Sequence, residues 1–296
     1  MNVELVPGKY VVAVSGGVDS MVLLKILSVQ PDVELIVAHF DHGIRTDSVE
    51  DRKLVEKTTV LLGLKFEFAE GNLGPGASEE TARNARYKFL HNIRFKYDAV
   101  ALVTAHHQDD LIETALLNVL RGTGRKGLTS LGSTDKIKRP LLAIPKQDIL
   151  KYARANDVTW REDSTNTDTT YLRNYVRQNL LPKLSKDRRS KLINLLITLQ
   201  DQNQELDIQI ADYLQLGEKD PQLLNKKSFV ALPHAVACEA MASWLRQNGI
   251  WDFDRKTIER LVVASKTLRP HQRVDINKMK YLYLDKATLA IKTMDR

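Results

Sequence analysis

The residues best suited to chemistry form a short run of small and polar residues near the start of the chain. They are Ser15-Gly16-Gly17-Val18-Asp19-Ser20. A β-branched apolar stretch precedes this run, as in a strand buried on both faces, and helical spacing follows it. Glycines allow positive φ and a close approach of the backbone to a ligand, and a helix start attracts anions. The run predicts a phosphate-binding loop; the simpler alternative is an ordinary strand-to-helix turn. It matches neither G-x-x-x-x-G-K-[ST] nor G-x-G-x-x-G.

Histidines follow two later apolar stretches. Four of the seven histidines of the chain occur there, namely His39, His42, His106 and His107. A metal site is one interpretation of these loops. The interpretation that we favour is neutral imidazoles that hydrogen-bond a nucleotide or the backbone.

Two acidic residues, Asp110 and Glu113, stand three positions apart at the start of a predicted helix. Both carboxylates therefore project from one helix face and could bind an ammonium group. Acidic residues also favour any helix N-terminus through the macrodipole. The spacing alone leaves both interpretations open.

Several arginines occur in patterns that suit an anionic partner. Arg86 flanks the apolar stripe of a predicted helix, and Arg121 opens a glycine-rich basic loop. Arg173 and Arg177 are four residues apart and share a helix face, a spacing that suits phosphate contacts. A solvated surface is an equally ordinary explanation for each of them.

The order of the expected elements predicts the fold that must position these residues. Strand-like runs alternate with helical patterns; the strands are expected at residues 9–14, 33–40, 64–69 and 99–104, and the helices at 20–27, 48–63 and 78–95. This alternation is typical of the α/β class with a doubly wound parallel sheet. Ligands of such sheets bind beyond the carboxyl ends of the strands, where the glycine run and the histidines occur.

The remainder of the chain has a different character. Arg139-Pro140-Leu141-Leu142 is expected to be extended, and residues 146–156 helical. Beyond about residue 186 the pattern predicts amphipathic helices at 192–216, 234–247 and 254–265, and closing strands at 273–276, 281–284 and 288–292. We therefore expect a catalytic domain over residues 1–186 and a smaller, mainly helical domain over residues 187–296.

Composition narrows the function classes. The 296 residues carry a net charge of +7, and residues 121–191 hold 17 Lys and Arg against 7 Asp and Glu. Such a basic segment suggests a nucleic-acid partner, although charge clusters are usually solvated faces. The single cysteine, Cys238, excludes a disulfide framework and a Cys-x-x-Cys metal site. There is no long apolar run and no signal-peptide pattern, so we expect a cytoplasmic protein without a membrane partner.

The glycine run resembles the pyrophosphate loop of the N-type ATP pyrophosphatases, also called the PP-loop superfamily. With further motifs in the same order, the chain resembles the bacterial tRNA(Ile)-lysidine synthetases. These motifs are His39-x-x-His42-Gly43-x-Arg45, His106-His107-x-x-Asp110-x-x-Glu113-Thr114, Arg121-Gly122-Thr123-Gly124 and Arg173-Asn174-x-x-Arg177. They span about the first 180 residues, and the tail resembles that of short family members with a single C-terminal domain.

The resemblance implies an ATP-dependent ligase that modifies tRNA. Its substrates would be ATP with Mg²⁺, L-lysine and the isoleucine tRNA with a CAU anticodon. The enzyme would adenylate the C2 oxygen of the wobble cytidine and release pyrophosphate. The ε-amine of lysine would then attack C2 and expel AMP, which gives lysidine.

The same resemblance implies a role for each candidate residue. Asp19 and Arg86 would be catalytic, and Asp19 would also hold Mg²⁺. Asp110 and Glu113 would bind lysine, and the tail would bind tRNA together with Arg121, Arg173 and Arg177. ATP would be bound by Ser15, Gly16, Gly17, Val18, Asp19, Ser20, His39 and His106.

Two other kinds of function remain open. One is a different PP-loop RNA-modifying or amidating synthetase, such as a tRNA thiolase, an NAD synthetase or a GMP synthetase. A two-thiocytidine thiolase needs paired cysteines, which Cys238 alone does not supply. The other is a non-catalytic, ATP-gated RNA-binding protein. A homodimer is compatible with each of these functions.

Overall fold

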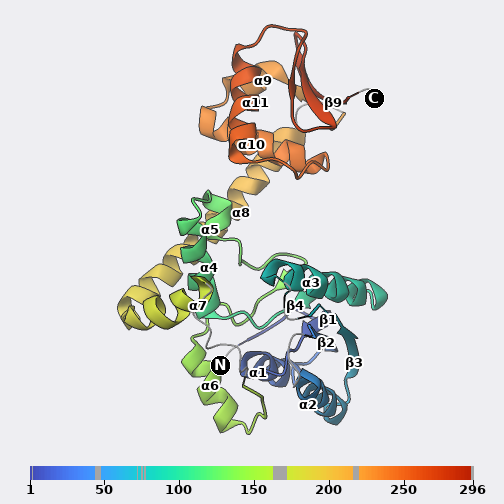
Figure 1. Ribbon diagram of the computed structural model, residues 1–296, viewed down its shortest axis with the longest axis vertical. Coiled ribbons are helices and arrows are strands. Elements are labelled where there is room, and N and C mark those ends of the chain that lie inside the picture. The colour runs from blue at the N-terminus through green and yellow to red at the C-terminus, as the bar shows by residue number, and fades with distance from the viewer. Residues whose placement is uncertain are drawn as a thin grey trace. The chain divides into compact units, whose positions relative to one another are not determined.

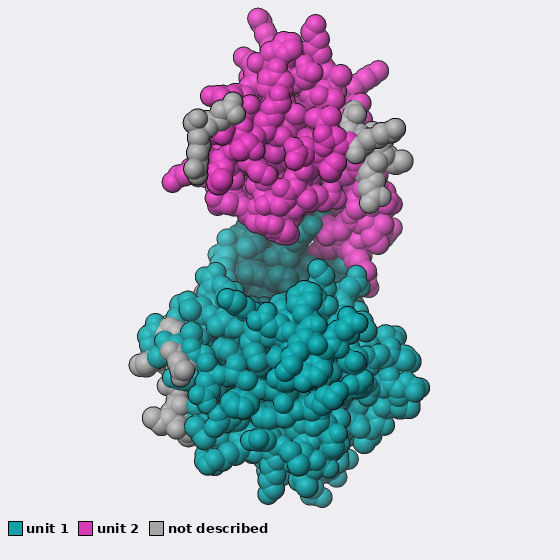
Figure 2. Space-filling view, turned by 90° about the vertical axis from the view of Figure 1, so that its right-hand side faces the viewer, with its two compact units in different colours: residues 1–200 teal, residues 201–296 magenta. Residues whose placement is uncertain are grey.

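The computed structural model describes residues 1, 3–43, 48–71, 73–74, 76, 78–162, 172–215 and 220–294. The chain forms two compact units, residues 1–200 and 201–296, which are coloured separately in Figure 2. The long helix α8 (Lys186–Gln215) begins where the sequence predicts the domain boundary, whereas the compact units divide within that helix.

The first unit contains a five-stranded sheet in the order β3-β2-β1-β4-β5, and every pair of neighbours is parallel. Its strands are β1 (Gly8–Ala13), β2 (Val33–Asp41), β3 (Lys65–Glu70), β4 (Ala101–Val103) and β5 (Ile137–Lys138). The predicted α/β class with a parallel sheet is therefore confirmed. The extended segment expected from Arg139 to Leu142 is wrong, because β5 ends at Lys138 and turns follow. Pro140 has no N–H to donate to a neighbouring strand, which agrees with the early end of β5.

Helices cover both faces of this sheet, with α1 and α2 on one face and α3 on the other (Figure 1). Val12 of β1 packs in one apolar cluster with residues of α1, and the adjacent Val11 packs in another cluster with residues of α3. The central strand is thus apolar on both faces, as its sequence predicts. The helices of this unit besides α8 are α1 (Val18–Leu27), α2 (Ser48–Leu61), α3 (Glu79–Lys96), α4 (Gln108–Leu120), α5 (Arg125–Leu128), α6 (Lys146–Ala155) and α7 (Leu172–Tyr175), followed by a π-helical turn (Val176–Leu180) and a 3₁₀ turn (Leu181–Lys183).

The strand order places a topological switch point between β1 and β4. The chain passes from β1 to β2 and β3 on one side, and then to β4 and β5 on the other side. The loops that leave the carboxyl ends of β1 and β4 therefore diverge, and this divergence leaves a crevice for a ligand. The glycine run follows β1, and His106 follows β4.

The second unit combines helices with an antiparallel sheet in the order β6-β9-β8-β7. The three predicted closing strands are confirmed, and β6 and α9 are additional to the predicted elements. Trp244, Phe229 and Leu282 are buried in its core. Its elements are β6 (Leu223–Asn225), α9 (Lys226–Ala231), α10 (His234–Gln247), α11 (Arg255–Thr267), β7 (Gln272–Asp275), β8 (Lys280–Leu284) and β9 (Thr288–Thr293). Among the described residues, no helix is long and apolar enough to cross a membrane.

Candidate active site

The glycine run forms a tight loop between β1 and α1. Gly16 has φ of +94°, and a Cβ atom on it would lie 3.3 Å from Cβ of Asp51. The hydroxyl of Ser20 accepts a hydrogen bond from N–H of Ser15 (3.1 Å) and donates one to the carbonyl of Gly17 (2.9 Å). Gly17 is the N-cap of α1 and has no side chain that could accept from the first backbone N–H groups of the helix. This geometry suits a bound anion.

A cavity of about 430 Å³ lies at the carboxyl ends of the central strands. It brings together predicted site residues from four separate segments of the sequence, namely Ser15, Gly17, Asp19, Ser20, His39, Arg86, His106 and Asp110. The other predicted site residues, Gly16, Val18, Glu113, Arg121, Arg173 and Arg177, do not line it. The cavity therefore joins the glycine run Ser15 to Ser20, called the anion loop below, to Asp110, the first of the two predicted lysine-binding acids.

Two imidazoles at the cavity form hydrogen bonds, and their burial favours the neutral form. Nδ1 of His39 lies 2.9 Å from the carbonyl of Val14, and Nδ1 of His106 lies 2.8 Å from the hydroxyl of Thr104. Burial lowers the pKa of both imidazoles below the ordinary value. Nε2 of His39 is buried and has no hydrogen-bond partner within the part of the chain that the structure describes. A ligand in the cavity could supply that partner.

Arg86 lines the cavity, and it belongs to α3, which covers the face of the sheet opposite α1. Its Nε is buried without a hydrogen-bond partner among the described residues, and burial lowers the pKa of the guanidinium. The guanidinium also lies 5.5 Å from the ring centre of Tyr87. A buried arginine that still has an unused donor is suited to bind an anion in the cavity.

Lys146 binds Asp19 and His107 lies near it, and the sequence analysis gave neither residue a role at Asp19. Nζ of Lys146 lies 2.6 and 2.7 Å from the two carboxylate oxygens of Asp19. Nε2 of His107 lies 3.7 Å from Asp19 and 3.6 Å from Asp110, between the anion loop and the acid pair. Only the position of His107 in a post-strand loop hinted at its role, and no local pattern pointed to Lys146.

The acid pair lies on one face of α4, as its spacing predicts. Glu113 is fully buried, and Arg177 binds both of its carboxylate oxygens, at 2.6 and 3.1 Å. Arg177 also lies 3.4 Å from Asp110, and Nε of Arg173 lies 3.4 Å from Glu113. Burial raises the pKa of Glu113, although Arg177 opposes the shift. Asp110 also accepts a hydrogen bond from N–H of His107 (2.9 Å), so it stabilises the helix start as well.

Several basic residues of the segment 121–191 pair with acids outside that segment. Besides the contacts of Lys146 and Arg177, Nε of Arg161 lies 2.8 Å from Asp51, and Arg189 binds Asp109. Part of the positive charge of this segment thus neutralises carboxylates of its own unit. Arg121, by contrast, is exposed at the C-terminal end of α4. Arg45 of the second motif and residues 163–171 lie outside the described residues.

A glycine loop at the switch point of a parallel sheet, with a cavity beyond it, defines a nucleotide-binding α/β domain. The chain belongs to the PP-loop domain family, which matches residues 2–184. Membership of this family implies that the domain binds ATP. It also confirms the resemblance of the glycine run to a pyrophosphate loop.

Two relatives with clear sequence similarity are both named tRNA(Ile)-lysidine synthase. A tRNA(Ile)-lysidine synthase of Legionella pneumophila (strain Lens) is 31% identical over 270 residues, which are 86% of this chain and 61% of that protein. A tRNA(Ile)-lysidine synthase of Exiguobacterium sibiricum is 39% identical over 182 residues, which are 60% of this chain and 44% of that protein. The chain thus spans less than two thirds of the length of these relatives.

The fold is also found in a solved structure. The U34-tRNA thiolase NcsA from Methanococcus maripaludis, solved with its [4Fe-4S] cluster, has a TM-score of 0.56 and 19% identity. The likeness covers 64% of this chain and 71% of that protein. At this identity it supports the architecture of the sheet and helices alone.

Proposed function

We propose that this chain joins lysine to C2 of the wobble cytidine of the isoleucine tRNA with a CAU anticodon, through an adenylated intermediate. The observation that carries the proposal is the position of Asp110, which lines the same cavity as the anion loop and shares Arg177 with the buried Glu113. A phosphate site and an ammonium site within one cavity suit a ligase that uses ATP and an amine. The similarity to tRNA(Ile)-lysidine synthases supports the choice of lysine and tRNA.

ATP is proposed to place its phosphates against the loop from Ser15 to Ser20. The Gly16 turn and the uncapped start of α1 support this placement, since both present backbone donors. His39 and His106 are proposed to contact the rest of the nucleotide, and the unused Nε2 of His39 supports this role.

Mg²⁺ is proposed to accompany ATP, with Asp19 as its protein ligand. A carboxylate beside a phosphate loop is the donor that Mg²⁺ prefers, and Mg²⁺ is usually bound through one or two carboxylates and the substrate phosphates. Asp19 would share its carboxylate between Lys146 and the ion. When bound, Mg²⁺ would neutralise charge on the phosphates.

The remaining roles follow from charge and burial. Arg86 is proposed to stabilise the negative charge that develops on the activated oxygen and the α-phosphate, because its buried guanidinium reaches the cavity. Asp110 and Glu113 are proposed to bind the lysine substrate. For that purpose the substrate ammonium would share, or take over, the contacts that Arg177 now makes.

The tRNA is proposed to contact Arg121, Arg173 and Arg177 and the second unit. Arg121 is exposed, which supports this role, whereas Arg173 and Arg177 also bind Glu113. A division into a catalytic domain and a tRNA-binding domain near residue 186, a cytoplasmic location and a homodimer are parts of the same proposal.

The test supplies the protein with ATP, Mg²⁺, labelled lysine and unmodified isoleucine tRNA with a CAU anticodon, and then treats the RNA with mild alkali. Label that stays on the RNA is expected, because lysine joined to a base is not an ester. Label that washes off would contradict the proposal and indicate aminoacylation. ATP cleavage without any label would indicate a different PP-loop synthetase, and nucleotide binding without turnover would indicate an RNA-binding protein.

A further inference from the structure

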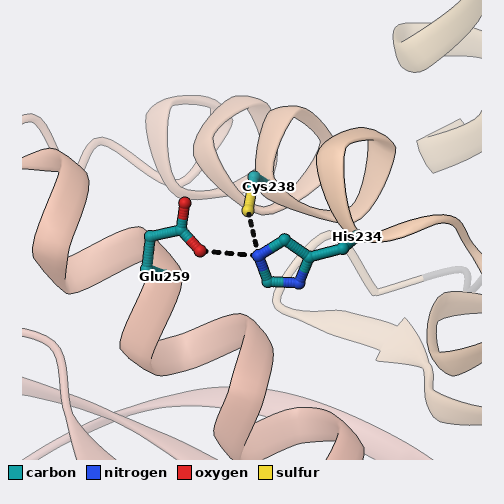
Figure 3. A group of neighbouring side chains, drawn as sticks. All are labelled: His234, Cys238 and Glu259. Atoms are coloured by element: carbon teal, nitrogen blue, oxygen red, sulfur yellow. Dashed lines mark hydrogen bonds and ion pairs between the residues drawn. The ribbon is translucent and has the colours of Figure 1, made fainter.

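A second cluster of reactive side chains lies in the other unit, away from the ATP cavity in sequence. His234 and Cys238 lie on α10, one helical turn apart, and Glu259 lies on α11 (Figure 3). Nε2 of His234 is 2.6 Å from the Glu259 carboxylate, and Sγ of Cys238 is 3.7 Å from the same nitrogen. The nitrogen, sulfur and oxygen atoms all lie within 4.8 Å of one another.

From this convergence we propose that His234, Cys238 and Glu259 bind one Zn²⁺ ion, which links α10 to α11. Nitrogen, thiolate sulfur and carboxylate oxygen are the three ligand types that Zn²⁺ takes in proteins. Mg²⁺ and Ca²⁺ prefer oxygen ligands alone, so the sulfur and the imidazole favour a softer ion. This proposal is independent of the proposed ligase function.

The distances fit such an ion after a small adjustment. Tetrahedral ligands of Zn²⁺ stand about 3.3 to 3.6 Å apart, given ordinary bond lengths to nitrogen, oxygen and sulfur. The separation of Sγ from Nε2 is already close to this range. Nε2 of His234 and the Glu259 oxygen, now 2.6 Å apart, would have to move apart by about 0.7 Å. The ion would replace the hydrogen bond between the His234 imidazole and the Glu259 carboxylate, and the thiol would release its proton to solvent.

The backbone positions of the three ligands are fixed by the packing of the two helices. Ala237 next to Cys238, and Ile258 next to Glu259, are buried in the core of the unit. Lys266 of α11 also donates a hydrogen bond to the carbonyl of Leu232, just before α10. Ligands on rigid, packed helices need only side-chain rotations to close on an ion.

The surface position implies an exchangeable site. The side chains of His234 and Glu259 are 51% and 40% exposed, so solvent reaches the cluster and a water would be the fourth ligand. Arg255 lies near the cluster, with Nε 3.9 Å from the other Glu259 oxygen. It faces the oxygen that is turned away from His234, so it can neutralise the carboxylate without occupying the proposed ion position.

The experiment titrates the untagged chain, reduced and free of chelator, with Co²⁺ as a spectroscopic probe. One equivalent is expected to give the visible bands of tetrahedral Co²⁺ and a near-ultraviolet sulfur-to-cobalt band, and Zn²⁺ should displace both. Cys238→Ser should abolish the sulfur band, and each of Cys238→Ser, His234→Ala and Glu259→Gln should weaken Zn²⁺ binding by at least about tenfold. His271→Asn is the matched control, since His271 is exposed and lies 3.7 Å from a carboxylate of Asp285 in the same unit.

A second readout does not depend on colour. Zn²⁺ should raise the melting temperature of the wild-type chain and of His271→Asn, but not that of Cys238→Ser, because only a folded-state ligand stabilises by mass action. All variants should keep the wild-type melting temperature in chelator, because exposed ion pairs contribute little to stability. The proposal would be overturned if Co²⁺ gave no saturable spectrum, or if Cys238→Ser left the spectrum and the Zn²⁺ affinity unchanged.

Discussion

Lys146 donates hydrogen bonds to both carboxylate oxygens of Asp19 across a sequence separation of 127 residues. Asp19 stands in the first turn of α1 and Lys146 is the first residue of α6, so the contact links two helix starts. The ammonium holds the carboxylate in one orientation at the wall of the cavity.

We expect Lys146→Met to lower the rate of lysidine formation by at least about tenfold, because an acid that is no longer held loses its orientation towards the substrates. Asp19→Asn should abolish the reaction, and both variants should keep tRNA affinity. Single-turnover assays and filter binding measure the two quantities. Lys151→Met is the control, since Lys151 lies on the same helix and pairs with the exposed Asp148. A wild-type rate for Asp19→Asn would refute the role given to that residue.

Gly16→Ala should weaken ATP binding by at least about tenfold. An added Cβ would meet Asp51 at 3.3 Å, and φ of +94° disfavours any side chain, so the loop would have to rearrange. Calorimetric titration with ATP measures the effect. Gly124→Ala should bind ATP as the wild type does, because nothing lies within 4 Å of its added Cβ. Equal affinities for both variants would count against the loop as the phosphate site.

Asp110→Asn and Glu113→Gln should each raise the KM for lysine by at least about tenfold, while ATP affinity is unchanged. The reason is the loss of a charge-assisted hydrogen bond to the ammonium, worth about 1.5–3 kcal/mol. Asp109→Asn changes the adjacent carboxylate, which binds Arg189, and should leave KM unaltered. If all three variants raised KM alike, the effect would be one of helix stability rather than of lysine binding.

Stability should fall on acidification, and His106 should account for part of the fall. Burial lowers the pKa of His106 from 6.5 to about 3, so within this window the unfolded chain binds a proton that the folded chain does not. The folded state keeps its full stability with respect to His106 above pH 6.5 and loses it progressively as the pH falls towards the folded-state pKa of about 3. His106→Gln should therefore flatten the decrease in melting temperature between about pH 7 and about pH 5. The variant of an exposed histidine, His271→Gln, should keep the wild-type slope.

Arg121→Ala should weaken tRNA binding and reduce its salt dependence by about one released counterion, if Arg121 contacts a phosphate. Arg173→Ala combined with Arg177→Ala should act in the same direction. That pair is best tested in a Glu113→Gln background, where removing the two arginines does not leave a buried Glu113 carboxylate without its cations. Lys65→Ala, at the amino end of β3 and opposite the cavity edge, is the control. An unchanged salt slope would remove the tested residues from the tRNA surface.

The local parts of the fold and of the site could be predicted from the sequence. The alternation of strands and helices, the loop from Ser15 to Ser20 and the shared face of Asp110 and Glu113 all depend on residues close in the chain. The missed features depend on contacts between distant residues, such as Lys146 with Asp19. The elements β6 and α9 were missed because they are too short to show a period.

Contacts between distant residues also explain why the basic segment 121–191 was attributed to an external polyanion. Charge counting along the chain does not reveal that Arg177 is bound to Glu113, 64 residues earlier, or Arg161 to Asp51, 110 residues earlier. A carboxylate that is buried needs a cation, and the chain supplies it from a later helix or loop. A spacing of four residues between two arginines therefore predicts a shared helix face, but it does not predict which anion binds there.

The contacts of the anion loop also determine at which point during synthesis the loop can be braced. β1 and the loop are synthesised before the residues that brace them: N–H of Arg161 donates to the carbonyl of Gly16, and Lys146 binds Asp19. A nascent chain that ends before these residues holds the complete glycine run but lacks the groups that brace it. Nucleotide affinity would thus arise only after Arg161 has emerged, so ATP would stabilise chains that include Lys146 and Arg161 but not shorter ones.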